Sequence, residues 1–235
     1  MNFRAIIFDL FGTIVGDFSA AAASYQRDFS NALGVPYEPL MQHWRQLTDR
    51  RTLGEFQTVE ESIEHVCGLM GATVTAAQMM KAAETRLNLT RHVLTPRHDA
   101  MATFKRLKTD GFKIGLLSNC SIEIPIVWPE TELAPLFDST VFSSRERIKK
   151  PAAQIYHLAC ERLGVKPQDC LYVADGENYE LKAAAEVGMY PLLIRTPSAE
   201  TRGEVLREAR EWRGDAIATL SETLRILGID QSKTS

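Results

Sequence analysis

The stretch FRAIIFDLFGT, residues 3–13, decides the fold. Four consecutive apolar residues, 5–8, run into a single carboxylate, Asp9, and Gly12 and Thr13 then break the run. A short apolar run bounded by turn residues is typical of a strand that is buried on both faces. Asp9 then stands at the carboxyl end of that strand, where open parallel sheets place their binding sites. An Asp at this place also fits a simple turn, so the rest of the chain must distinguish the two interpretations.

From residue 94 onward, strand and helix patterns alternate, which predicts a parallel sheet with crossover helices. The further strands are expected at residues 113–117, 140–142, 170–174, 190–194 and 215–218. The helices are expected at residues 97–110, 122–128, 152–163, 178–187, 202–212 and 220–227. Residues 230–235 are polar and are expected to form a disordered tail. The pattern predicts an α/β fold, a Rossmann-like parallel sheet with helices on both faces.

Between the first strand and this alternating region, the pattern stays helical. Phe18, Ala22, Tyr25 and Phe29 recur at the spacing of one helix face, and residues 40–47, 59–70 and 76–87 repeat such spacing. The sequence therefore predicts four helices inserted directly after the first strand. We expect a discontinuous core, residues 1–14 and 93–235, with an all-helical cap at residues 15–92.

Composition excludes several classes of protein. The chain has 235 residues, of which 45% are hydrophobic and 24% are charged, as in ordinary globular proteins. A net charge of −3 gives no electrostatic argument for binding nucleic acid or an anionic membrane. Its apolar runs are too short to span a bilayer, and Asp9 interrupts any signal peptide. The four cysteines form no CxxC pair, so we expect a reduced, cytoplasmic protein, monomeric or homodimeric.

Three further motifs follow Asp9 in order. Ser118 follows the strand at 113–117, Lys150 directly precedes a proline, and Asp175 and Glu180 follow the strand at 170–174. This set, together with Gly12-Thr13, resembles the four motifs of the haloacid dehalogenase superfamily, in the subfamily with a helical cap after the first motif. The resemblance covers almost the whole chain. It implies a hydrolase with an aspartate nucleophile and a cap that closes over the active site.

The first two motifs supply candidates for attack and for substrate binding. Asp9 is the expected nucleophile, since a carboxylate can form a covalent intermediate that water then cleaves. The backbone at Gly12 and Thr13 is expected to donate N–H groups to substrate oxygens, because glycine permits a close approach. Ser118 and Asn119 stand where a strand ends and a turn opens, and a hydroxyl with free N–H groups there favours an anion.

The last two motifs supply the charges around the nucleophile. Lys150 is expected to neutralise negative charge on Asp9 and the substrate. The resemblance implies that Asp9, Asp175 and the backbone carbonyl of Phe11 hold Mg²⁺, with Glu180 orienting that shell. Oxygen ligands and retained waters suit Mg²⁺. Glu180 also fits an exposed helix residue.

Phe11 departs from the phosphatase pattern of the superfamily. Most of its phosphatases carry a second Asp there, which protonates the leaving alkoxide and later activates water. Phenylalanine does neither, and such acid–base help is worth about 10²–10⁴ in rate. A halide leaving group needs no proton, and the 2-haloacid dehalogenase branch carries an aromatic residue at this position. An acyl phosphate and phosphonatase-like chemistry are further alternatives.

Charge favours the other interpretation. Without a metal, Asp9, Asp175 and Glu180 crowd three negative charges around Lys150, and like charges disfavour an ionised nucleophile. Metal-independent haloacid dehalogenases generally replace the acid at the Asp175 position. Retention of that acid favours Mg²⁺ and phosphate over halide.

The expected cap adds one candidate for substrate contact. Arg45 follows Trp44 on the second cap helix, and an arginine that points into the cleft grips a phosphate or a carboxylate bidentately. The Trp-Arg pair resembles the haloacid dehalogenase cap, although cap arginines are usually just solvated.

The leading hypothesis is therefore a Mg²⁺-dependent phosphatase that acts on a small phosphorylated metabolite. The rivals are a metal-independent 2-haloacid dehalogenase that uses the same Asp9, and a non-catalytic binding or regulatory relative. The expected partner is a small anionic molecule, with neither nucleic acid nor membrane.

Overall fold

In the residues that the computed structural model describes, 3–16, 18–195 and 207–229, six parallel strands form one open sheet. The strands are β1 (Ala5–Phe8), β2 (Lys113–Ser118), β3 (Ser139–Phe142), β4 (Cys170–Ala174), β5 (Tyr190–Ile194) and β6 (Ala216–Ile217). Their order across the sheet is β3-β2-β1-β4-β5-β6, so the direction of winding reverses at β1. Ile7 lies opposite Gly115 of β2 on one side and Tyr172 of β4 on the other. In this topology ligands bind in the crevice at the carboxyl ends of the strands beside the switch point.

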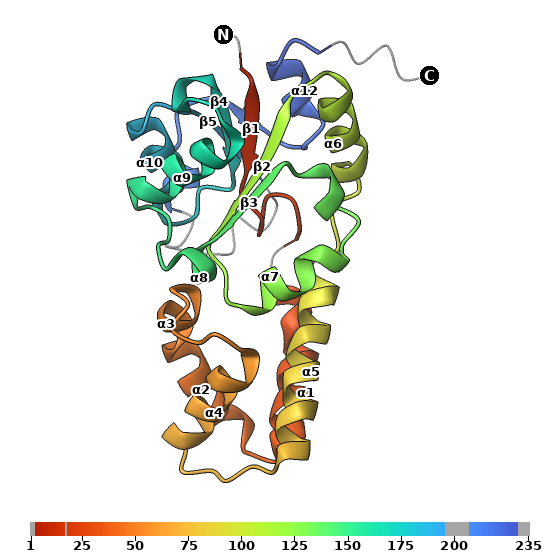
Figure 1. The fold of residues 1–235 in the computed structure, drawn as a ribbon, viewed down its shortest axis with the longest axis vertical. Helices are drawn as coiled ribbons and strands as arrows, with labels where there is room; N and C mark the ends of the chain where they lie inside the picture. The colour runs from red at the N-terminus through yellow and green to blue at the C-terminus, as the bar shows by residue number, and fades with distance from the viewer. Residues whose placement is uncertain (1–2, 17, 196–206, 230–235) are drawn as a thin grey trace.

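Two layers of helices cover the sheet, which confirms the predicted Rossmann-like α/β fold (Figure 1). One face packs against α6 (Ala100–Thr109), α7 (Glu123–Val127) and α12 (Glu222–Ile226). The other face packs against α9 (Ala153–Leu163), α10 (Glu180–Glu186) and α11 (Arg207–Glu211). Ile6 and Phe8 belong to the first apolar cluster, whereas Ala5 and Ile7 belong to the second. Burial on both faces explains the continuous apolar run before Asp9.

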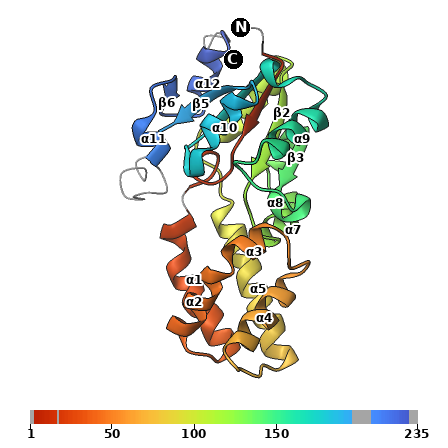
Figure 2. The same cartoon turned by 90° about the vertical axis from the view of Figure 1, so that its left-hand side faces the viewer.

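A separate group of helices is inserted between β1 and α6. They are α1 (Phe18–Leu33), α2 (Tyr37–Gln46), α3 (Thr48–Thr52), α4 (Val59–Leu69) and α5 (Ala76–Val93). These helices have an apolar cluster of their own, which includes Phe29, Trp44 and Ile63. Figure 2 shows them stacked beyond the end of the sheet, with α1 and α5 side by side. The boundaries of this cap at residues 15 and 92 remain a prediction.

Several contacts join the cap to the core. Ser143 of α8 (Ser143–Glu146) donates its hydroxyl proton to the carbonyl of Thr52 at 2.7 Å. Gly54 has a φ of +68°, and a Cβ there would lie 1.8 Å from the carbonyl oxygen of Ser144. Asp49 of the cap pairs with Lys149 of the core at 2.6 Å. These contacts seat α3 and the turn after it against the core.

The structure also differs from the predicted elements. α3 was not predicted, because only Leu47 separates it from α2. The helix expected at 178 begins at Glu180, since Asn178 and Tyr179 adopt left-handed φ values of 53° and 60°. The start of the helix expected at 202–212 and the predicted tail at 230–235 lie outside the described residues.

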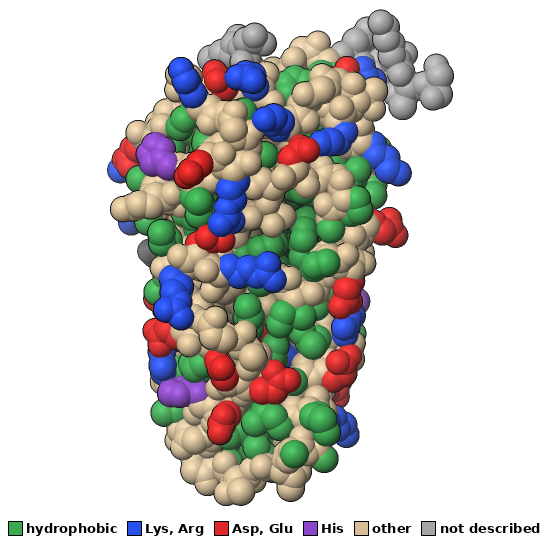
Figure 3. All heavy atoms as spheres, in the orientation of Figure 1, with side chains coloured by type: hydrophobic (Ala, Val, Ile, Leu, Met, Phe, Trp, Pro, Cys, Tyr) green, Lys and Arg blue, Asp and Glu red, His purple; other side chains and the backbone are tan. Residues whose placement is uncertain are grey.

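The described surface agrees with the modest net charge. Acidic and basic side chains are interspersed over the face drawn in Figure 3, and no continuous basic field covers that face. Among the described residues, no helix is both long enough and apolar enough to cross a bilayer.

Candidate active site

The predicted site residues meet at the carboxyl ends of adjacent strands. Asp9 follows β1, Ser118 ends β2 and Asp175 follows β4. Because β1 lies between β2 and β4, the first two motifs and the last one converge there. Lys150 arrives from the segment before α9, and Glu180 is the first residue of α10.

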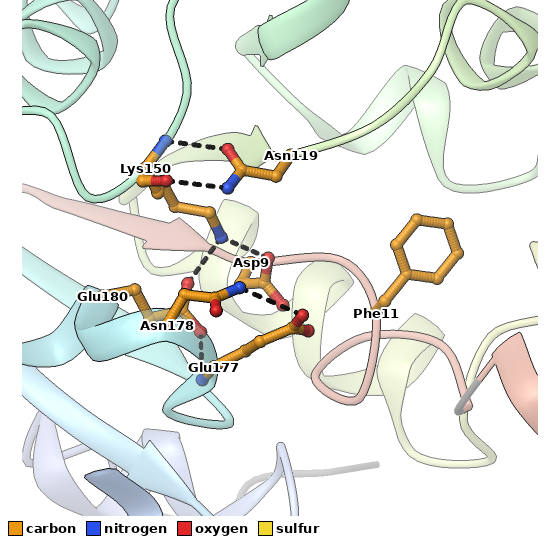
Figure 4. Close-up of a pocket in the computed structure, with 7 residues that line it drawn as sticks. All are labelled: Asp9, Phe11, Asn119, Lys150, Glu177, Asn178 and Glu180. Carbon is orange, nitrogen blue, oxygen red and sulfur yellow. Dashed lines mark hydrogen bonds and ion pairs between the residues drawn. The ribbon is translucent and has the colours of Figure 1, made fainter. Parts of the chain in front are cut away.

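The ammonium group of Lys150 is the centre of the site (Figure 4). Its Nζ lies 2.5 Å from Oδ1 of Asp9 and 2.5 Å from Oε2 of Glu180. It also lies 3.1 Å from the hydroxyl of Tyr172, which donates to the same Glu180 oxygen at 2.7 Å. Lys150, Asp9 and Glu180 are 5%, 6% and 1% exposed. Charge-assisted hydrogen bonds at such burial are strong and fix the positions of both carboxylates.

Asn119 holds the backbone of Lys150 in place. Its amide Nδ2 donates to the Lys150 carbonyl at 3.0 Å, and its Oδ1 accepts from the Lys150 N–H at 2.8 Å. This two-point contact fixes where the lysine side chain begins. Asn119 was predicted to bind substrate, and the structure gives its amide this positioning contact at the edge of the cavity.

Three buried carboxylates form a group that fits a divalent cation. Oxygen atoms of Asp9, Asp175 and Glu180 lie within 4.8 Å of one another. The backbone N–H of Glu177 donates to Asp175 and to Glu180, at 3.1 Å in each case, and so orients both acids. Three carboxylates and one ammonium carry a net charge of −2 (−3 + 1), which one divalent cation balances. Hard oxygen donors of this kind suit Mg²⁺.

Burial and charge act in opposite directions on the central pair. The pKa of Asp9 is raised to about 6. Burial is the largest cause, Glu180 also raises this pKa, and Lys150 lowers it without cancelling the rise. Burial alone lowers the pKa of Lys150, but Asp9 and Glu180 raise it above its ordinary value. The lysine therefore stays protonated, and a further positive charge beside Asp9 would lower the raised pKa of the nucleophile and favour its ionised form.

Gly12 allows the first and last motifs to touch. It has a φ of +74°, and a Cβ there would lie 2.1 Å from Oδ2 of Asp175. Only glycine fits this conformation and this approach without strain. The hydroxyls of Thr13 and Ser118 are fully buried and bond to no nitrogen or oxygen of the described protein. They remain candidates for binding substrate oxygens.

Two spaces that share lining residues adjoin the site. A cavity of about 50 Å³ is lined by Asp9, Phe11, Asn119, Lys150, Glu177, Asn178 and Glu180. A larger cleft of about 300 Å³ lies between cap and core, and Phe11 and Asn119 line both spaces. We call the larger space the arginine cleft, because Arg45, Arg51 and Arg86 line it beside Trp44. The predicted substrate residue Arg45 therefore reaches this cleft, and its side chain is exposed.

Sequence reasoning gave no specific role to four residues of this region. Tyr172 resembles any aromatic residue of a buried strand, so the sequence offered no signal for its role. Glu177 was detectable as an acid between Asp175 and Glu180. Arg51 and Arg86 lie on α3 and α5, and only the folded cap brings them together.

Comparisons with known proteins identify the family of this chain. The family model described as haloacid dehalogenase-like hydrolase matches residues 3–188. The chain belongs to this family. It is 26% identical over 200 residues to (S)-2-haloacid dehalogenase 4A of Burkholderia cepacia, covering 82% of this chain and 83% of that one. It is 30% identical over 103 residues to a glyceraldehyde 3-phosphate phosphatase of Methanopyrus kandleri, covering 43% of this chain and 44% of the phosphatase.

Solved structures show the same fold. An L-2-haloacid dehalogenase shares 26% identity and a TM-score of 0.67, covering 96% of this chain and 99% of the dehalogenase. A family enzyme of Bacteroides thetaiotaomicron, solved with magnesium and inorganic phosphate, shares 16% identity and a TM-score of 0.64. That alignment covers 83% of this chain and 96% of the Bacteroides enzyme. Haloacid dehalogenases and phosphatases are thus both among the relatives of this hydrolase.

Substitution of Gly12 tests the contact between the first and last motifs. In Gly12→Ala the new methyl group must displace the Asp175 carboxylate, and a misplacement of about 1 Å in an active site costs roughly 100-fold in rate. We expect hydrolysis to fall by at least that factor while thermal unfolding still shows a folded protein. Gly16→Ala is the matched control, because a Cβ there meets nothing within 4 Å. Wild-type hydrolysis by Gly12→Ala would show that the contact is not required.

Proposed function

We propose that this hydrolase is a Mg²⁺-dependent phosphatase of a small phosphorylated metabolite. The observation that carries the proposal is the excess of negative charge in the site. Asp9, Asp175 and Glu180 are all buried and offer oxygen atoms within 4.8 Å of one another, and Lys150 contacts two of them, Asp9 and Glu180. A haloacid carboxylate entering such a site adds charge of the same sign, whereas a divalent cation removes the excess before any substrate arrives.

The residues divide the chemistry among them. Asp9 attacks phosphorus in line, the alcohol leaves, and water cleaves the aspartyl-phosphate that remains. Asp9, Asp175 and the Phe11 carbonyl would hold Mg²⁺, which supplies positive charge to the phosphoryl oxygens. Lys150 holds Oδ1 of Asp9 in place and balances the charge of this carboxylate. Gly12, Thr13, Ser118 and Asn119 are the proposed contacts for the phosphoryl group.

Glu177 is our proposed replacement for the acid–base residue that Phe11 cannot supply. Its side chain lines the same cavity as Asp9 and Phe11 (Figure 4). Glu177 belongs to the turn after β4 and not to the loop of Phe11. The cavity therefore still holds a carboxylate that can act as the acid, although position 11 is a phenylalanine. The Glu177 carboxyl is only half-buried. It can therefore take up a proton from water again after it has protonated the leaving group.

A metal-independent 2-haloacid dehalogenase is the second candidate. Phe11 favours it, since halide leaves without a proton, and so does the similarity to the (S)-2-haloacid dehalogenase of B. cepacia. The same Asp9 would then attack carbon instead of phosphorus.

Paired hydrolysis distinguishes the two candidates. One arm offers an aryl phosphate, and the other offers 2-chloropropionate and follows halide, each with magnesium or with a chelator. We expect phosphate release that requires magnesium and is lost in Asp9→Asn. Halide release that resists the chelator would overturn the phosphatase and make Phe11 the better guide.

Leaving-group dependence tests Glu177. In Glu177→Gln, the single-turnover rate with an alkyl phosphate should fall by about 10²–10⁴, because that leaving group needs a proton. The burst of phenolate from an aryl phosphate should change little. Glu186→Gln, on the exposed side of α10, is the control. Equal losses with the two substrates would exclude Glu177 as the acid.

A further inference from the structure

The arginine cleft is positively charged, in contrast to the catalytic cavity beside it. Arg45, Arg51 and Arg86 line it, and none of the described residues that line it is acidic. Its volume of about 300 Å³ is at the lower end of the range for small-molecule sites. Because Phe11 and Asn119 border both spaces, one ligand can occupy the two together.

One of these arginines is neutralised by the protein itself. Arg86 donates from Nε and Nη2 to Oε1 of Glu123, at 3.3 Å and 3.1 Å. The two residues are 5% and 1% exposed, so they form a buried ion pair between α5 and α7. This pair joins cap to core and contributes no net charge to the cleft.

Arg51 carries a charge that no described carboxylate pairs. Its guanidinium stacks on the Trp44 ring at 4.3 Å, and its Nη2 donates to the Trp44 carbonyl at 3.4 Å. Its Nε is buried and donates to no atom of the described residues. Burial lowers the pKa of Arg51 to about 10; Glu123 raises that pKa and Arg86 lowers it. Arg51 as a whole is half-buried, and a cation with a buried, unused donor is stabilised by an anion that reaches it.

We propose that Arg51 is the receptor for a carboxylate group on the substrate. The inference rests on the proposed phosphatase function and narrows it. The substrates are then small phosphomonoesters that also bear a carboxylate, with the phosphate at Asp9 and the carboxylate in the arginine cleft. The carbon chain between the two groups passes Phe11 and lies against Trp44 and Ile124, the apolar lining of the cleft. A planar carboxylate matches the guanidinium fork, of which Trp44 covers only one face.

Arg51 is also the residue to change. Replacing Arg86 would leave Glu123 buried without a partner and would destabilise the fold. Arg51 has no carboxylate that depends on it within ion-pair distance among the described residues. Arg50 provides the matched control, because it precedes Arg51 in α3 but pairs with Glu55 at 2.6 Å on the surface, outside the cleft.

The substrate arm of the test compares the phosphate ester of 3-hydroxypropanoate with that of the matching amide. We expect wild-type protein and Arg50→Met to prefer the acid by roughly 10- to 100-fold in kcat/KM, the value of a charged hydrogen bond. Arg51→Met should bring the ratio close to one, and Arg51→Lys, which keeps the charge, should restore part of it. A wild-type ratio near one, or a ratio that Arg51→Met leaves unchanged, would overturn the inference.

A binding arm separates this inference from the proposed function. Calorimetry with 3-hydroxypropanoate, which has no phosphate to transfer, measures the carboxylate site alone. We expect binding to wild-type protein that weakens at least tenfold in Arg51→Met and not in Arg50→Met. Such binding, without release of phosphate from the aryl phosphate or from the two esters of the substrate arm, would overturn the proposed phosphatase function and support the carboxylate site at Arg51. Hydrolysis of the aryl phosphate, together with 3-hydroxypropanoate binding that does not depend on Arg51, would support the phosphatase function and overturn the carboxylate site.

Discussion

The buried ammonium of Lys150 is the constraint on which the site depends. One lysine contacts Asp9 and Glu180 at 2.5 Å each, although the two acids lie far apart in the sequence. Asn119 fixes its backbone and Tyr172 shares its contact with Glu180. Burial would otherwise force at least one of these acids to take up a proton. The lysine holds the core strands and α10 in one arrangement, and it leaves an excess of negative charge that a divalent cation can balance.

The two spaces that Phe11 lines carry side chains of opposite charge. The core side presents carboxylates, whereas the cap side presents Arg45 and Arg51, since Glu123 neutralises Arg86. The substrate that we propose spans both sides, with one group in the cavity beside Asp9 and a second anion against the arginines. Phe11 stands between them as an apolar wall, so its side chain has a place in substrate binding even though it cannot transfer protons. This interpretation reconciles an aromatic residue at position 11 with a complete set of acids.

Local patterns predicted most of the fold, because each buried strand is an apolar run bounded by turn residues. β4 and β5 begin and end where the sequence placed them, and the motif acids meet because parallel strands share one edge. The features that the sequence did not predict depend on contacts between residues far apart in the chain. The role of Tyr172 requires the registration of β4 against β1, and the pairing of Arg86 with Glu123 requires a seated cap. Asparagine adopts the left-handed backbone of Asn178 more readily than most residue types do, but the same conformation at Tyr179 follows from no preference of tyrosine.

The stability of the protein as a function of magnesium concentration tests the central claim most directly. Thermal unfolding of chelator-treated protein would be followed during a MgCl₂ titration, against NaCl of equal ionic strength and with Asp175→Asn as a control. If the cation balances the buried acids, it stabilises only the folded state. At 100 times its Kd the gain is about 2.7 kcal/mol, or roughly 5–10 °C in Tm for a chain of this length. A saturable rise in the wild type that Asp175→Asn loses is the predicted result. A Tm that does not respond to magnesium would contradict the account.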